Sequence, residues 1–371
     1  MKYQFITLLL FSIALFYPLQ PSMATVDSGI TFGPYVQRIT KKAATVLIRT
    51  NNEKQVTLNY QNNSGKWKKI TDSTARTKHR YRITKLQPAH TYSYYLSIGD
   101  KRLTQTYTIR TEKEINKDNP LKIATVGDAG VLNTNSLQVA AQIQAWNPEM
   151  LLHTGDIAYN SGTLAEFTNN VFPVYQSVFA NIPTYGTPGN HDYTTDQAGP
   201  YKDLFEIPKA NSNTEDYYSF NYDFVHIVSV NSNVDYSIGS EMYNWLETDL
   251  QANQDKLWKI VILHHPPYSS GVHGNTIDTH YTLVPLFEDN DVNLVLAGHD
   301  HAYERSKKIN DVLYIVTGGG GKSLYSQTHD TTNSNLYVAD YHFTGLTVKK
   351  KKITIRAIDK NGYVFDKYIL R

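Results

Sequence analysis

The hydrophobic pattern changes between residues 112 and 120, and this change restricts the chain to two domains of different class. Up to residue 111 the chain is a series of short strand-like runs separated by turn clusters. Residues 112–120 are charged and polar, without apolar periodicity. From Leu121 onward, strand-like runs alternate with stretches whose apolar residues recur at helical spacing. The pattern predicts an all-β sandwich over residues 28–112 and an α/β domain over residues 120–371.

The first 24 residues have the features of a cleaved secretory signal peptide. Met1 and Lys2 precede an uncharged apolar run over residues 5–17, and Ser22-Met23-Ala24 supplies a small–x–small cleavage pattern. The run is too short to span a bilayer comfortably, and an uncleaved anchor is the alternative. We therefore expect a secreted or periplasmic protein without a stable membrane anchor.

Composition excludes several classes of site and partner. The 371 residues carry a formal net charge of only +2, which is too balanced for a protein whose main partner is a nucleic-acid backbone. There is no cysteine, which excludes zinc–thiolate sites, iron–sulfur clusters and disulfides, including disulfides between subunits. The oligomeric state stays open.

Polar side chains with metal-binding chemistry follow five predicted strands of the α/β part. Because ligand sites in α/β sheets lie outside the carboxyl ends of the strands, these five ends should converge. One such block alone is typical of a turn or a structural histidine, but five together predict a metal site. The blocks are Gly127-Asp128-Ala129-Gly130, Gly155-Asp156-Ile157-Ala158-Tyr159, Gly189-Asn190-His191-Asp192, Val261-Ile262-Leu263-His264 and Gly298-His299-Asp300-His301.

The number of candidate ligands favours two ions over one. A single catalytic ion needs fewer protein ligands, because its site must keep an open position. If one carboxylate bridges, seven residues supply four contacts to each of two ions. The candidates are Asp128, Asp156, Tyr159, Asn190, His264, His299 and His301.

In this order, the five blocks resemble the purple acid phosphatase branch of the metallophosphoesterases. The family pattern is GDxG, GDxxY, GNH[ED], VxxH and GHxH, and this chain has GDAG, GDIAY, GNHD, VILH and GHDH. Leu86-x-Pro88-x-x-x-Tyr92 also resembles the tyrosine corner of fibronectin type III domains, where the phenol bonds to nearby backbone. The resemblance implies a fibronectin type III-like sandwich followed by a four-layer α/β/β/α catalytic domain.

The resemblance further implies which ion each residue holds. Asp128, Tyr159 and His301 would hold the first ion. Asn190, His264 and His299 would hold the second, and Asp156 would bridge the two. The phenolate of Tyr159 suits Fe3+, and the neutral amide and imidazoles of the second site suit a divalent ion such as Zn2+, Fe2+ or Mn2+.

Two further histidines are expected to act on the substrate. By resemblance, His191 would face the phosphate, and His273 would contact the phosphate or protonate the leaving alkoxide. Gly274 stands where some relatives have a second histidine, so the assignment of His273 has less support. We interpret His265 as structural.

The implied activity is hydrolysis of small-molecule phosphate monoesters by an activated water, without a covalent intermediate. One alternative is a metal-dependent phosphodiesterase acting on nucleotides or lipid head groups. Another is an adhesion or binding module with an inert metal site, which the complete ligand set argues against.

The segment from Thr317 to Ser323 resembles a phosphate-binding P-loop only superficially. The pattern GxxxxGK[ST] requires glycine at position 316, where the chain has Val316. We instead expect a glycine-rich loop that passes close to the metal site.

Overall fold

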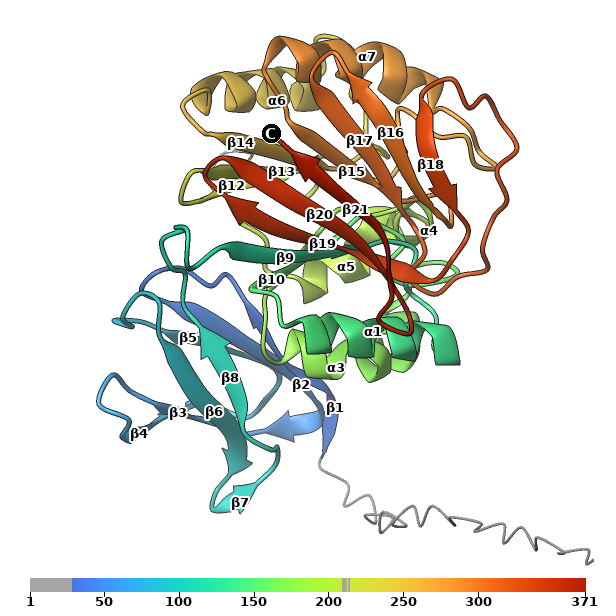
Figure 1. Ribbon diagram of the computed structural model, residues 1–371. Coiled ribbons are helices and arrows are strands. Elements are labelled where there is room, and N and C mark those ends of the chain that lie inside the picture. Colours follow the sequence, from blue (N-terminus) through green and yellow to red (C-terminus); the bar gives the residue numbers. More distant parts are fainter. Residues whose placement is uncertain (1–28, 209–211, 213) are drawn as a thin grey trace, which may run out of the picture.

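The computed structural model describes residues 29–208, 212 and 214–371, and its all-β part precedes an α/β part (Figure 1). The signal peptide expected at residues 1–24 lies outside the described residues. Within the described residues, no helix combines the length and apolar character needed to cross a bilayer.

The N-terminal part contains two antiparallel sheets. In one sheet the strand order is β1-β2-β5, and in the other β3 and β6 pair centrally with β4, β7 and β8 around them. The strands are β1 (Ile30–Gln37), β2 (Ala44–Lys54), β3 (Thr57–Gln61), β4 (Trp67–Thr71), β5 (Arg76–Ile83), β6 (Thr91–Ile98), β7 (Lys101–Arg102) and β8 (Tyr107–Arg110). Alternate residues such as Val46, Ile48, Tyr94 and Leu96 are buried between the sheets, as in a β-sandwich.

The tyrosine corner is confirmed. The phenol oxygen of Tyr92 accepts a 2.7 Å hydrogen bond from the backbone N–H of Gln87 and donates to Asn63 Oδ1 at 2.6 Å. This side chain therefore ties the start of β6 to the preceding loop.

The α/β part contains two mixed sheets. The six-stranded sheet has the order β11-β10-β9-β19-β20-β21, and the seven-stranded sheet has the order β12-β13-β14-β15-β17-β16-β18. The strands of the first sheet are β9 (Leu121–Val126), β10 (Met150–His153), β11 (Thr184–Gly186), β19 (His342–Lys349), β20 (Lys352–Asp359) and β21 (Val364–Leu370). Those of the second are β12 (Tyr218–Tyr222), β13 (Val225–Ser229), β14 (Trp258–Ile262), β15 (Leu294–Ala297), β16 (Tyr303–Ile309), β17 (Val312–Thr317) and β18 (Ser334–Val338).

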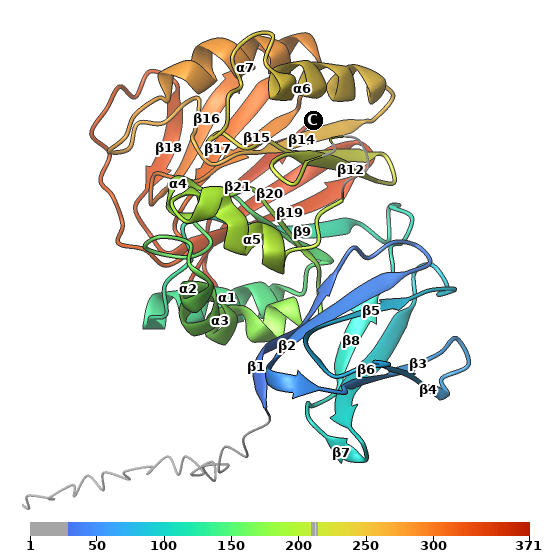
Figure 2. The same cartoon turned by 180° about the vertical axis from the view of Figure 1, so that it is seen from behind.

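Helices cover the outer faces of both sheets and complete the expected four layers (Figures 1 and 2). α1 and α3 lie on one side, and α6 and α7 lie on the other. The helices are α1 (Thr134–Trp146), α2 (Leu164–Glu166), the π-turn η1 (Phe167–Val171), α3 (Phe172–Phe179), α4 (Asn190–Tyr193), the 3-10 turn η2 (Asp196–Ala198), α5 (Gly199–Leu204), α6 (Glu241–Ala252) and α7 (Ile277–Asp289).

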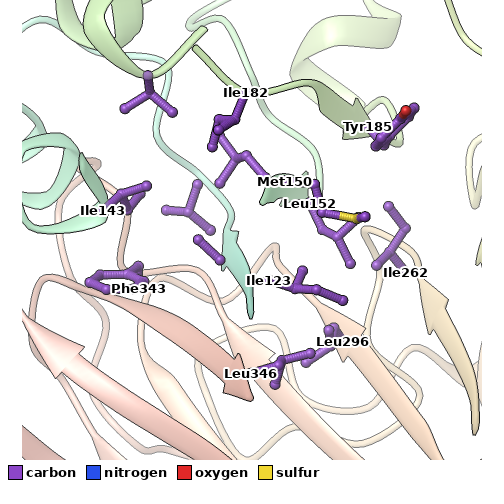
Figure 3. Close-up of a cluster of buried hydrophobic side chains, with 14 of the residues drawn as sticks. Ile123, Ile143, Met150, Leu152, Ile182, Tyr185, Ile262, Leu296, Phe343 and Leu346 are labelled. Carbon is purple, nitrogen blue, oxygen red and sulfur yellow. The ribbon is translucent and has the colours of Figure 1, made fainter. Parts of the chain in front are cut away.

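The main hydrophobic core lies between the two sheets and under α1 and α3. Figure 3 shows Ile123 and Leu346 of the first sheet close to Ile262 and Leu296 of the second. A second cluster packs α6 and α7 on the seven-stranded sheet, with Leu246 among its buried residues. Because both faces are covered at the centre of the seven-stranded sheet, β13, β14, β15 and β17 are buried along their whole length.

One predicted element was wrong. The apolar run 218–231 reads in the sequence as one strand, but the structure has a hairpin of β12 and β13 there. The chain turns at Asp223, whose φ of 55° lies in the left-handed region that aspartate tolerates. Apolar residues on both sides of this turn concealed it. The basic run 349–352, which in the sequence is typical of a solvated face or a hairpin tip, is the tip of the β19–β20 hairpin.

The sandwich packs directly on the α/β part. Phe32 of β1 stacks on Phe172 of α3 with ring centres 4.2 Å apart. Tyr35 donates a 2.8 Å hydrogen bond to Leu204 O, and Tyr94 donates one of 2.6 Å to Ala180 O. These buried contacts join the two parts through side chains as well as through the linker.

Glu112, at the start of the linker, should make stability depend on pH. Burial raises the pKa of this carboxyl to about 7 from 4.5, with Lys41 opposing. Since the folded-state pKa lies above the unfolded one, stability falls as pH rises from about 4.5 to 7. We expect Glu112→Gln to reduce this pH-dependent fall in the free energy of unfolding by roughly 2 kcal/mol. Urea unfolding at pH 5 and pH 8 measures it, with exposed Glu114→Gln as control. An unchanged pH dependence in Glu112→Gln would contradict the prediction.

Candidate metal centre

The five polar blocks follow the carboxyl ends of β9, β10, β11, β14 and β15. Strands β9 to β11 run parallel in one sheet, and β14 and β15 run parallel in the other. Their ends meet, because ligand atoms of Asp128, Asp156 and His264 all lie within 4.8 Å of one another. The seven candidate ligands predicted from the sequence are thus brought together by both sheets, through the contacts described next.

One half of the cluster forms around Asp128. The Tyr159 hydroxyl lies 2.9 Å from Asp128 Oδ1 and 3.2 Å from His301 Nε2. His301 Nε2 is in turn 3.5 Å from Asp128 Oδ1. These are the three residues expected to share the first ion.

The other half forms around His264. Its Nε2 lies 3.0 Å from Asn190 Oδ1 and 3.5 Å from Asp156 Oδ1. The ring of His299 lies 5.1 Å from that of His264, centre to centre. Asp156 faces this half and is held by the backbone N–H of His191 at 2.9 Å.

The loops that carry these residues adopt unusual backbone conformations. Asp128, Asp156 and His299 have φ of 56°, 52° and 72°, in the left-handed region. A side chain on Gly189 would overlap the Asp156 carboxylate. Strained non-glycine residues of this kind concentrate at functional sites.

The donor set fits cations. The Nδ1–H groups of His264 and His301 donate to the carbonyl oxygens of Thr154 and Ser323 at 2.8 and 2.7 Å. In the neutral imidazole, Nε2 then has only a lone pair. For His264 this lone pair faces another one, that of Asn190 Oδ1, at 3.0 Å. A positive ion resolves this repulsion, and carbonyl-oriented imidazoles are the usual arrangement around metals. Residues with these contacts fit metal binding.

Electrostatics in the cluster point the same way. Burial opposes ionisation of Asp128, but the hydrogen bond and charge of His301 hold the pKa of that carboxyl below its usual value. Burial and the Asp128 and Asp156 carboxylates raise the pKa of the Tyr159 phenol well above 10. Burial and the adjacent imidazole of His264 lower the pKa of His299. The ligand set thus combines the His299 imidazole, which resists protonation, with the His301 imidazole, whose pKa is raised, despite burial, by the hydrogen bond and charge of Asp128.

His191 and His273 stand at two edges of the cluster. His191 Nδ1 bonds to Asn160 O at 2.6 Å, and its partly exposed ring lies 4.6 Å from the Tyr159 ring. The His273 ring stacks 3.9 Å from that of His299, and its Nδ1 lies 2.9 Å from Asp300 Oδ1. Both imidazoles are next to ligands and partly open to solvent.

Several residues at the site carried no clear sequence signal. Asp192 accepts backbone hydrogen bonds that join the second and third blocks. Tyr325 stacks on His301 at 4.1 Å between ring centres, and Lys322 lies over Tyr159. His265 is grouped with His264 and His299 and bonds to Ser232 Oγ at 2.8 Å. Lys322 belongs to the segment that superficially resembles a P-loop. This segment passes close to the site, since the Gly320 N–H donates to Gly127 O.

Comparison with known proteins defines the class. Residues 121–303 match the family model described as calcineurin-like phosphoesterase. The chain is 27% identical over 249 residues to probable purple acid phosphatase 20 of Arabidopsis thaliana, covering 62% of this chain and 57% of that one. It is also 27% identical to Fe(3+)-Zn(2+) purple acid phosphatase 12 of the same plant, covering 61% and 52%. The chain therefore spans about half the length of these curated relatives.

A solved structure shares the fold. The purple acid phosphatase from yellow lupin (Lupinus luteus) seeds superimposes with a TM-score of 0.79 at 19% identity, covering 91% of this chain and 73% of that one. Residues 121–303 are thus similar to calcineurin-like phosphoesterases in sequence. The chain shares the fold of a purple acid phosphatase, with an N-terminal β-sandwich before the α/β part, and it is similar in sequence to plant purple acid phosphatases.

Proposed function

We propose that this protein hydrolyses small-molecule phosphate monoesters at a centre of two metal ions, as an acid phosphatase of the purple type. The observation that carries the proposal is the convergence of ligand atoms from all five blocks, in which His264 Nε2 faces Asn190 Oδ1 and His301 Nε2 adjoins the Tyr159 phenol. A cation between these donor atoms would relieve their repulsion, and paired cations are the usual means of hydrolysing phosphate esters.

The first ion, Fe3+, would be held by Asp128, Tyr159 and His301. The second, Zn2+, Fe2+ or Mn2+, would be held by Asn190, His264 and His299, with Asp156 shared. When bound, the two ions supply charge that stabilises phosphate oxygens and make water acidic enough to act as a nucleophile. The relative named as an Fe(3+)-Zn(2+) enzyme supports this pair of metals.

The histidines at the edges would act on the substrate. His191 donates from Nδ1 to Asn160 O, so in the protonated imidazolium form its Nε2–H would be free to donate to a phosphate oxygen. His273 is held at Nδ1 by Asp300, which leaves its Nε2 to give a proton to the departing alkoxide. Both atoms adjoin the ligand cluster, so neither histidine has to move far to reach a bound ester.

Two assays test the substrate class. The metal-loaded protein should hydrolyse 4-nitrophenyl phosphate with a higher kcat/KM than bis(4-nitrophenyl) phosphate. A higher kcat/KM for the diester would replace this proposal with a phosphodiesterase acting on nucleotides or lipid head groups. Binding of metal with hydrolysis of neither ester would favour a binding module with an inert site.

Tyr159→Phe tests the ferric assignment. The phenolate of Tyr159 is the donor whose charge transfer to Fe3+ would colour the protein, so the variant should lose the visible absorption band of the wild type. Visible spectra and metal analysis of both proteins measure this, with Tyr193→Phe as a matched control outside the ligand set. A colourless, iron-free and active wild type would contradict the assignment and leave a phosphoesterase with two divalent ions.

We also propose that residues 1–24 are removed on export and that the mature protein is secreted or periplasmic. Residues 28–112 and 120–371 would then be its two domains. Mass spectrometry of the exported protein tests this, because cleavage after Ala24 gives a new N-terminus at Thr25.

A further inference from the structure

Lys322 places an ammonium group at the edge of the candidate metal centre. Its Nζ lies 4.4 Å from the centre of the Tyr159 ring and donates a 2.9 Å hydrogen bond to Asn160 Oδ1. Its backbone N–H donates to Asp128 O at 3.1 Å. The residue is therefore fixed to the first two ligand blocks, although it lies more than 150 residues away in the sequence.

The glycine run before Lys322 makes this close approach possible. A side chain on Gly318 would overlap the backbone of Asp300, and one on Gly320 would overlap Gly127 O. The loop can pass between the ligand blocks only because these positions lack side chains. It thereby delivers Lys322 to Tyr159.

The charge of Lys322 has no carboxylate partner. Among the described residues, its ammonium contacts the neutral Asn160 amide and the Tyr159 ring, and no acidic side chain forms an ion pair with it. Lys113, by contrast, is paired with Glu149 at 2.7 Å, whereas Lys122 and Lys360 are also held by neutral oxygens but lie away from the ligand cluster. A partly buried cation held by neutral groups is available to an anion that binds beside it.

His191 belongs to the same edge. Its Nδ1 bonds to the backbone oxygen of Asn160, whose side chain accepts from Lys322. Both groups also contact the Tyr159 ring. Asn160 thus holds a histidine and an ammonium group together next to a candidate metal ligand.

We propose that Lys322 binds the dianionic phosphoryl group of a phosphate monoester and so favours monoesters over diesters at this site. The inference rests on the proposed function. A monoester has three terminal oxygens and close to two negative charges at pH 7, whereas a diester has two terminal oxygens and one charge. Because Coulomb attraction scales with charge, an ammonium at this edge stabilises the monoester more.

The test compares Lys322→Gln with Lys322→Arg in the metal-loaded protein. Lys322→Gln keeps a side chain able to bond to Asn160 but removes the charge, and Lys322→Arg keeps the charge. Exposed Lys351→Gln is the matched control. The measurements are titration calorimetry with inorganic phosphate and with dimethyl phosphate, metal content, and kcat/KM for the two nitrophenyl esters.

We expect Lys322→Gln to weaken inorganic phosphate binding about tenfold or more and dimethyl phosphate binding less than threefold. Monoester kcat/KM should fall at least about tenfold further than diester kcat/KM, and metal content should stay unchanged. Lys322→Arg should restore a large part of the phosphate affinity. Lys351→Gln should match the wild type.

Equal losses for monoester and diester, unchanged phosphate binding, or loss of metal from Lys322→Gln would each overturn the inference. Any of these results would make Lys322 a structural support of Tyr159 or Asn160. The phosphate titration needs no turnover. An inactive wild type would therefore overturn the proposed function, while the phosphate affinities would still decide the role of Lys322.

Discussion

We expect Asp156→Asn to lower kcat/KM for phosphate monoesters by at least ~10³-fold, which corresponds to roughly 4 kcal/mol of transition-state stabilisation. Asp156 is the carboxylate proposed to bridge the two ions, and it lies 3.5 Å from His264 Nε2. An amide is neutral, whereas the carboxylate that would be shared by the two ions is anionic. Metal content should therefore fall below two ions per chain together with activity.

The unfolding midpoint of the metal-free protein distinguishes this loss of activity from damage to the fold. The backbone N–H of His191 can still donate to an amide oxygen at position 156, so the unfolding midpoint of the metal-free variant should be no lower than that of the metal-free wild type. The exposed Asp255→Asn serves as control. A variant with two ions per chain and activity within about tenfold of wild type would show that Asp156 does not bridge.

The sequence was sufficient to place the candidate ligands because each follows its strand within a few residues. Asp128 comes two residues after β9, and His264 comes two residues after β14. Parallel strands send their carboxyl ends to one edge, so correct strand prediction brought distant ligands together. The tyrosine corner was predictable for a related reason, since Tyr92 and Gln87 interact over five residues.

The remaining parts of the site depend on contacts between distant segments. Lys322 bonds to Asn160, which lies 162 residues earlier in the chain, and no sequence pattern links the two residues. Tyr325 stacks on His301 from a loop that has no apolar periodicity to predict its path. The 218–231 hairpin was missed for the opposite reason, because a local turn at Asp223 lay inside an apolar run. Short-range pattern thus located the ligands but not the groups that surround them.

Asp192 should matter for stability even without metal. This fully buried carboxylate accepts the backbone N–H groups of Ile157, Ala158 and Gly189, each at 2.9 Å, and so connects the loop of Asp156 to the loop of Asn190. Asp192→Ala leaves three buried donors without a partner, and each unsatisfied group costs about 1–3 kcal/mol. We therefore expect the metal-free variant to lose roughly 3–6 kcal/mol of stability in urea unfolding.

The contrast with Asp156 makes this prediction specific. If Asp192 acts by accepting backbone hydrogen bonds, the stability of Asp192→Asn should lie between those of the wild type and Asp192→Ala, because one side-chain oxygen remains to accept. Asp255→Ala, at an exposed position, should change stability by less than about 0.5 kcal/mol. Metal-free Asp192→Ala that is as stable as metal-free wild type would assign Asp192 to the metal centre alone. A large loss in Asp192→Ala beside none in Asp156→Asn would show that the second and third blocks are positioned before any ion binds.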